Sequence, residues 1–138
     1  MHDGNAVLQI APGGSLSGYG NIYENFGGAS VNNAGNLRVT AGQTMAISTD
    51  SVTLSGGTTT VPTLAILQVS GQLTQTGGST TVNGNLNLSR TYVLQGGVLE
   101  GNGIVNGSVD NSGGDVNPGD GPGLLSIIGN YEQDAAGN

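Results

Sequence analysis

The chain contains no cysteine, no tryptophan and no lysine. Without cysteine, disulfide frameworks, thiolate metal sites and thiol nucleophiles are excluded. The only cationic side chains besides His2 are Arg38 and Arg90, and nine acidic residues bring the net charge to -7. Nucleic-acid binding requires clustered Lys and Arg that neutralise phosphates. The composition therefore predicts no nucleic-acid partner and no polybasic contact with a membrane surface.

Long hydrophobic runs are missing as well. No apolar segment approaches the about 18 residues that a membrane-spanning helix needs. The first residues, MHDGNAVLQIAPGG, lack the basic region and the long apolar core of a signal peptide. We therefore expect no membrane span, and a chain that is either a mature form or a segment of a longer protein.

Glycine is abundant, at 27 of 138 residues, and charged residues make up only 8% of the chain. Disordered chains combine low hydrophobicity with high charge. Here the charge density is low, and the hydrophobic residues, 35% of the chain, are regularly placed. The length favours one domain. We predict a single ordered domain over residues 1–138 whose surface carries hydroxyls and amides instead of charges.

The hydrophobic residues occur as short pairs two positions apart, which is typical of strands with one buried face. These pairs are Leu37/Val39, Met45/Ile47, Val52/Leu54, Leu64/Ile66, Leu67/Val69 and Leu86/Leu88. Gly-Gly pairs separate the strands, and Asn83-Gly84 and Asn106-Gly107 add turn signals. No window keeps a helical apolar stripe without an interrupting glycine. The pattern predicts an all-β chain with little or no helix.

Several segments resemble one another. GGSLSGYGNI (13–22) aligns without a gap to GGVLEGNGIV (96–105), and GGTTTV (56–61) resembles GGSTTV (77–82). Repeat-like blocks therefore cover about 13–54 and 96–138, with further coils between them. Repeats of about 20 residues are typical of solenoids, in which stacking of coils creates the core. We expect about seven coils of this length.

An antiparallel sandwich or barrel would also show short strands and frequent turns. Aromatic residues are only 4% of the chain, with a single Phe. Sandwich cores more often contain a large aromatic anchor, whereas single layers of Val, Leu and Ile fill a narrow coil. Together with the repeats, this favours a parallel β-solenoid.

The last third of the chain, GGVLEGNGIVNGSVDNSGGDVNPGDGPGLLSIIGNYEQDAAG (96–137), resembles the strand repeat of autotransporter passengers and related adhesin-like surface proteins. It contains a Gly-Gly-x-Leu-x-Gly-x-Gly strand, a Pro-Gly-x-x-Pro-Gly turn over 118–123 and an aliphatic strand ending in Gly-Asn-Tyr-x-Gln. Residues 13–54 resemble the repeat more weakly. The resemblance implies a right-handed parallel β-helix at a bacterial cell surface, without catalysis by the repeat itself.

Three aspartates in or just before the glycine- and proline-rich segment 112–123 are candidate calcium ligands. Asp110, Asp115 and Asp120 lie five residues apart, and calcium takes several oxygens from a short loop. Their spacing matches neither an EF-hand loop nor the nonapeptide of calcium-binding β-rolls. We interpret them as solvated turn carboxylates, predict no metal and no cofactor, and expect the segment to form a corner between coils.

Catalysis is not predicted. Phosphate-binding loops open a helix and carry a Lys, and neither is present. Polysaccharide-cleaving β-helices use paired carboxylates, and the nine acids here are scattered. Asp50 and Glu100 would need to meet by stacking of coils. His2, the only imidazole, lies at the N-terminus, where a triad is not expected.

Two further groups of residues are candidate binding or modification sites. Tyr19, Tyr23, Tyr92 and Tyr131 would either stack on sugar rings or, as we favour, pack at strand edges with wet hydroxyls. Asn87 and Asn106 stand in glycosylation sequons, although chance matches are expected in a chain so rich in Asn and Ser.

A solenoid exposes unpaired backbone groups at each end, and natural proteins block such edges with Lys, Pro, bulges or a cap. Neither NAVLQIAPGG nor GNYEQDAAGN contains a Lys or a recognisable cap. The ends would then pair with other copies or with adjoining repeats of a longer chain. Together with the extracellular setting that the resemblance implies, these ends predict a non-enzymatic stalk, fibre or matrix element. The alternatives are a carbohydrate-binding adhesin module and, third, a polysaccharide-degrading β-helix.

Overall fold

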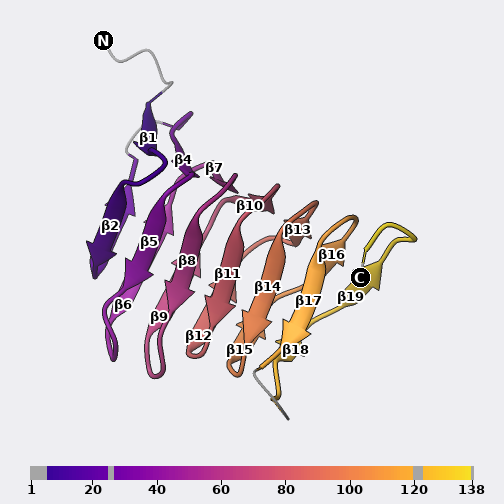
Figure 1. Cartoon of the computed structure of the whole chain (residues 1–138). Coiled ribbons are helices and arrows are strands. Elements are labelled where there is room, and N and C mark those ends of the chain that lie inside the picture. The colour runs from indigo at the N-terminus through magenta and orange to yellow at the C-terminus, as the bar shows by residue number, and fades with distance from the viewer. Residues whose placement is uncertain (1–5, 25–26, 120–122, 138) are drawn as a thin grey trace.

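The computed structural model describes residues 6–24, 27–119 and 123–137, and these residues form a parallel β-solenoid of about six turns (Figure 1). Each turn adds one short strand to each of three parallel sheets. No helix occurs in these three ranges. The predicted all-β solenoid of short, glycine-punctuated strands is confirmed.

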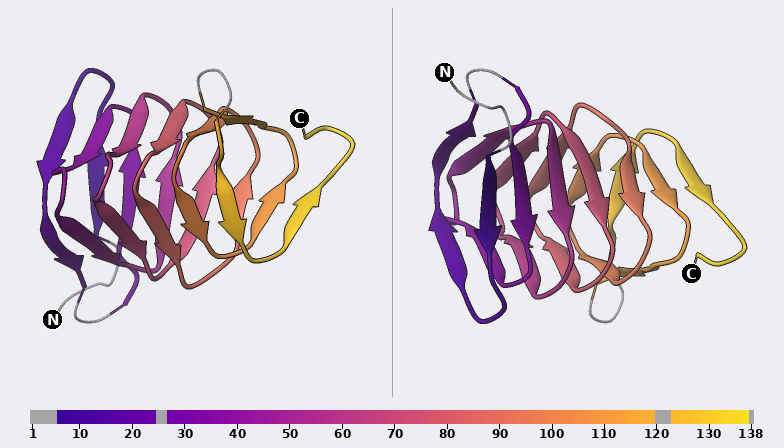
Figure 2. Two further views of the ribbon diagram at one scale, coloured as in Figure 1. Left: turned by 90° about the horizontal axis from the view of Figure 1, so that it is seen from below. Right: turned by 90° about the horizontal axis from the view of Figure 1, so that it is seen from above.

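The three sheets run the length of the molecule (Figure 2). Sheet A contains β1 (Val7–Ile10), β4 (Ser30–Asn33), β7 (Ser51–Leu54), β10 (Gln72–Gln75), β13 (Tyr92–Leu94), β16 (Val109–Asn111) and β19 (Tyr131–Gln133). Sheet B contains β2 (Ser15–Gly18), β5 (Asn36–Val39), β8 (Thr58–Val61), β11 (Ser79–Val82), β14 (Val98–Gly101) and β17 (Asp115–Pro118). Sheet C contains β3 (Gly20–Tyr23), β6 (Thr44–Ser48), β9 (Ile66–Val69), β12 (Asn85–Leu88), β15 (Ile104–Asn106) and β18 (Ser126–Ile128).

We number the coils by their strands, so that β1, β2 and β3 form coil 1 and β16, β17 and β18 form coil 6. The last strand, β19, begins a further coil on sheet A. Alternate residues of each strand point into the coil, because side chains of a strand alternate between its two faces. Equivalent residues of successive coils therefore stack in columns along the axis, and the interior is one layer of side chains from each coil.

Most interior columns are aliphatic. One column of sheet B, for example, contains Val39, Val61 and Val82, all fully buried. At about 25 cal/mol per Å² of apolar surface removed from water, stacking such side chains is the main favourable term of the fold. A coil alone could not bury them, so the stability of each coil depends on its neighbours.

Glycine permits the close stacking at the corner between sheets A and B. Gly57 has φ +64°, and a Cβ there would lie 1.9 Å from the carbonyl oxygen of Gly35 in the preceding coil. Only glycine combines this left-handed backbone with the absence of a side chain. The second glycine of this Gly-Gly pair is thus required by the corner at which it lies.

The repeats recognised in the sequence occupy equivalent positions. GGTTTV and GGSTTV form β8 and β11, with Thr58 beside Ser79. The 13–22 and 96–105 blocks both run from a sheet B strand into sheet C, in coils 1 and 5. Coil length varies, however, from 25 residues between Gly20 and Met45 to 17 between Val98 and Asp115. The expected seven coils are accordingly about six.

Two local predictions were wrong. Leu64/Ile66 is not an inward pair: Leu64 lies in a turn before β9, and Ile66 is only half-buried. The segment 112–123 is not all corner, because Asp115–Pro118 pairs with β14 as strand β17. Local composition suggested a loop there, but the backbone of β14 supplied hydrogen bonds that outweigh the low strand propensity of Asp, Asn and Pro.

Candidate functional site

The inward face of sheet A contains a column in which amides alternate with aliphatic side chains as far as Asn111. From coil 1 onward it consists of Ile10, Asn33, Leu54, Gln75, Leu94, Asn111 and Gln133. Asn33, Gln75 and Asn111 are fully buried. A buried amide is costly unless its donors and acceptors are paired. Among the described residues, no buried side-chain N or O atom lacks a hydrogen-bond partner.

These amides form hydrogen bonds with the backbone of the corner that follows them in the chain and with side chains of neighbouring strands. Asn33 accepts a hydrogen bond from the Gly35 N–H at 3.0 Å and donates to Thr59 Oγ1 at 3.1 Å. Asn111 accepts from the Gly114 N–H at 2.9 Å. Each amide therefore stabilises a glycine-rich corner between sheets A and B from inside the coil. The role we assign to this column is structural.

Gln75 also connects two coils. Thr80 donates its hydroxyl to Gln75 Oε1 at 2.8 Å, and the Tyr92 hydroxyl donates to the same oxygen. Burial raises the pKa of Tyr92 above its ordinary value, and a hydrogen bond with Thr80 opposes this rise. Tyr92 is fully buried, so the expectation that all four tyrosines sit at strand edges with wet hydroxyls was wrong for this residue. Its polar tip finds partners inside the coil instead.

The acidic residues singled out from the sequence are not brought together. Asp110 is on β16 of sheet A and Asp115 begins β17 of sheet B, while Asp120 lies outside the described residues. In the described ranges, no group of three or more His, Cys, Asp or Glu side chains is arranged to hold a metal ion.

The pair Asp50 and Glu100 is not formed either. Asp50 lies in the turn before β7, where its Oδ2 accepts a hydrogen bond from the Gly28 N–H at 2.8 Å. Glu100 lies on β14 of sheet B. Stacking along the axis joins residues of one sheet only, and these two carboxylates belong to different parts of the coil.

The outer face of sheet B, whose strands lie side by side in Figure 1, is largely polar. Its two outward columns carry mainly hydroxyls and amides: Ser15, Asn36, Thr58, Ser79, Val98 and Asp115 in one, and Ser17, Arg38, Thr60, Thr81, Glu100 and Asn117 in the other. Thr58 donates to Asn36 Oδ1 at 2.7 Å, and Thr81 donates to Glu100 Oε1 at 3.1 Å. Hydrogen bonds between neighbouring strands thus fix some of these side chains in place.

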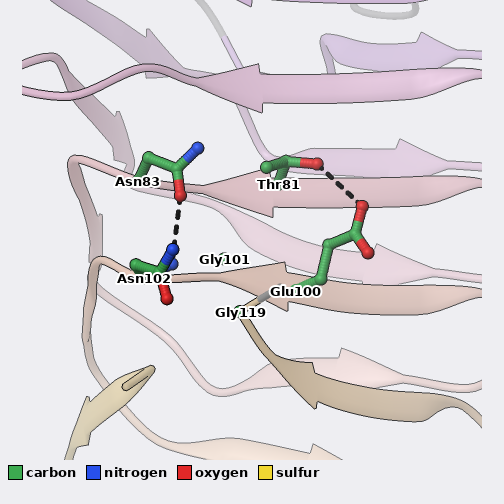
Figure 3. Close-up of a pocket in the computed structure, with 6 residues that line it drawn as sticks. All are labelled: Thr81, Asn83, Glu100, Gly101, Asn102 and Gly119. Carbon is green, nitrogen blue, oxygen red and sulfur yellow. Dashed lines mark hydrogen bonds between the residues drawn. The ribbon is translucent and has the colours of Figure 1, made fainter. Parts of the chain in front are cut away.

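A hollow opens where β11 and β14 end (Figure 3). It is lined by Thr81, Asn83, Glu100, Gly101, Asn102 and Gly119. The Asn102 N–H donates to Asn83 Oδ1 at 3.0 Å across the two coils. The hollow combines one carboxylate, one hydroxyl and two carboxamides, a set that both donates and accepts hydrogen bonds.

The two sequon residues face outward on sheet C, in adjacent strands β12 and β15. Asn106 donates from Nδ2 to Asn87 Oδ1 at 2.7 Å. A glycan attached to Asn106 would consume the amide nitrogen that makes this bond. Their glycosylation stays a prediction.

The two ends of the solenoid present apolar side chains. At the first coil, Leu8 stacks on the buried Val31 and is itself 41% exposed, and a hollow there is lined chiefly by Leu8, Leu16, Ile22, Met45 and the backbone around Tyr19. At the other end, Tyr131 stacks on the buried Val109 and is likewise 41% exposed. Among the described residues, the strands β1 and β19 each have a hydrogen-bonded neighbour on one side only. Interior side chains and strand edges are therefore accessible at both ends.

Comparisons with known proteins return nothing: no family model, no curated protein and no solved structure matches the chain. Within the described ranges there is also no helix long and apolar enough to cross a membrane.

Proposed function

We propose that the chain is a non-enzymatic structural element of an extracellular assembly, a stalk, fibre or matrix component whose end coils pair with further coils. These coils belong to other copies of the chain or to adjoining repeats of a longer protein. The resemblance of residues 96–137 to surface-protein repeats favours the extracellular setting. The observation that carries the proposal is the combination of open strand edges and exposed interior side chains at both ends.

The internal contacts show what such pairing would look like. Every coil pairs with the next through parallel strands in three sheets, and equivalent side chains stack in register. All strands of a sheet have the same direction, so the first coil of one copy would meet the last strands of another in the same geometry. This arrangement is head to tail, and such contacts generate open filaments. Low charge density limits the repulsion between copies.

Electron microscopy and analytical ultracentrifugation of the purified chain test this proposal. We expect filaments of constant width whose mean length rises with protein concentration. Leu8→Lys places a charge at the open end and should shorten the filaments, because a buried unpaired charge opposes strand pairing. Leu64→Lys is the matched control, since Leu64 is exposed on the side of the solenoid, between β8 and β9.

Circular dichroism establishes that both variants keep their β-structure. Discrete short rods at every concentration would refute head-to-tail assembly. So would filaments of equal length in Leu8→Lys and the unchanged chain.

A further inference from the structure

The hollow beside Glu100 contains a carboxylate whose position is fixed by its neighbours. Ser79 and Thr81 both donate hydroxyl hydrogen bonds to Glu100 Oε1, at 3.0 and 3.1 Å. Oε2 accepts no hydrogen bond from the described residues, and the side chain is half-buried. An acceptor already held in one rotamer loses little conformational entropy when a ligand binds.

Two carboxamides border the same hollow (Figure 3). The backbone N–H of Asn102 holds Asn83 through its Oδ1, which leaves the Asn83 amide nitrogen to donate elsewhere. The Asn102 side chain lies beside Gly119, where a Cβ would come within 2.3 Å of Asn102 Oδ1. The absence of a side chain at position 119 thus provides the space that Asn102 occupies at the edge of the hollow.

The charge of the surroundings restricts the ligand. Along the outward column, Thr60 and Thr81 separate Glu100 from Arg38, which places the cation roughly 14 Å away at the strand spacing of a sheet. An anionic ligand in the hollow would meet a carboxylate and no nearby cation along this column. A neutral polyhydroxyl ligand fits instead, because each sugar hydroxyl both donates and accepts a hydrogen bond.

We propose that this hollow binds a neutral glycan. Glu100 Oε2 accepts hydrogen bonds from sugar hydroxyls, and the carboxamides of Asn83 and Asn102 donate to sugar oxygens. The hydroxyls of Thr60 and Thr81, stacked in the adjoining coils of the same face, extend the contact along the solenoid axis. This binding site is separate from the open ends, so it does not rest on filament formation.

The test is an NMR titration of the ¹⁵N-labelled chain, kept dilute enough to be unassembled, with cellopentaose, maltopentaose and chitopentaose at millimolar concentrations. We expect at least one of them to shift the backbone and side-chain amide resonances of residues 81–83 and 100–102. An oligogalacturonate of similar length, which is anionic, should leave these resonances unchanged.

Glu100→Gln keeps the shape of the side chain and removes its charge. Because hydrogen bonds to charged groups are the stronger ones, affinity should fall roughly tenfold. Asp110→Asn is the matched control: the same change of carboxylate to amide, on sheet A and away from the hollow, should leave affinity unchanged. Asn102→Ala should also weaken binding.

Three results would overturn the proposal: no shift with any neutral oligosaccharide, equal binding of the oligogalacturonate, or equal affinity of the Glu100→Gln and Asp110→Asn variants. None of them bears on filament formation, which electron microscopy measures separately.

Discussion

Tyr92 donates its hydroxyl hydrogen to the side-chain oxygen of Gln75, linking the interiors of coils 5 and 4. The Gln75 nitrogen donates to the carbonyl oxygens of Gly78 at 3.2 Å and Val98 at 3.0 Å. With Thr80 as the second donor to its oxygen, every hydrogen-bonding position of the Gln75 amide is used. A satisfied buried network of this kind favours one arrangement of the coils over slipped ones.

Gln75→Leu should destabilise the protein although leucine occupies this column in the coils above and below. The change leaves the hydroxyls of Thr80 and Tyr92 without their acceptor inside the core. Unpaired buried polar groups cost about 1–3 kcal/mol each, so we expect the free energy of unfolding to fall by about 3 kcal/mol. Urea denaturation followed by circular dichroism measures the loss.

The triple variant Gln75→Leu, Thr80→Val, Tyr92→Phe is the control for this prediction. It removes the orphaned hydroxyls together with the amide, and replacing both partners of a hydrogen bond by apolar groups costs little. It should therefore be more stable than Gln75→Leu alone. Equal stability of the two variants would show that the network contributes nothing beyond packing.

The pH dependence of stability should reflect Tyr92. Burial raises its pKa in the folded state, whereas in the unfolded chain it ionises near the reference value of 10.0. Above that value the unfolded chain loses a proton that the folded protein keeps. The free energy of unfolding is therefore unaffected by Tyr92 below about pH 10 and falls as the pH rises further.

Absorbance of tyrosinate at alkaline pH measures this effect. Of the four tyrosines, one should remain protonated until the protein unfolds. In Tyr92→Phe, the late step should vanish and the alkaline decline in stability should become smaller. Simultaneous ionisation of all four tyrosines in the folded protein would contradict the buried position of Tyr92.

The sequence revealed the strands and most of the core, because Val, Leu and Ile two residues apart carry the signal of a half-buried strand. It did not reveal the buried amides. Asn33 and Asn111 stand next to Gly, Ala and Ser, where local composition indicates a surface turn, and only the stacking of coils places them inside. The number of residues between these amides also varies with coil length, so they do not recur at a fixed interval that could be recognised in the sequence. The Glu100 hollow was missed for the same reason: its residues come from coils whose register depends on the whole stack.

Some glycines are required by the distance between coils and not by their backbone angles. At Gly71, an added Cβ would lie 2.0 Å from the Thr49 carbonyl oxygen in the preceding coil. Gly71→Ala should thus separate two coils locally and lower the free energy of unfolding by about 3 kcal/mol, the upper part of the usual range for overpacking. At Gly56, the nearest atom, of Ala34, is 3.7 Å away, so Gly56→Ala should have little effect. Thermal unfolding of both variants compares them directly, and equal losses would rule out the steric explanation.

Leu64 occupies a position that the preceding coil gives to glycine. Gly42 and Leu64 have φ +74° and +65°, and each stands third in a turn closed by the same hydrogen bond, Gln43 N–H to Thr40 O and Ala65 N–H to Pro62 O, both 3.0 Å long. A non-glycine residue in this left-handed conformation costs about 1–3 kcal/mol. Leu64 gains little in return from burial, since it is 81% exposed.

Leu64→Gly should therefore stabilise the protein, by about 1 kcal/mol once the greater flexibility of glycine in the unfolded chain is subtracted. Gly42→Ala is the reciprocal change: a Cβ there meets no atom within 4 Å, so the expected loss of about 1 kcal/mol reflects the backbone alone. Urea midpoints of the two variants should move in opposite directions. If Leu64→Gly lowers the midpoint, the exposed leucine makes a stabilising contact that its position in the turn does not reveal.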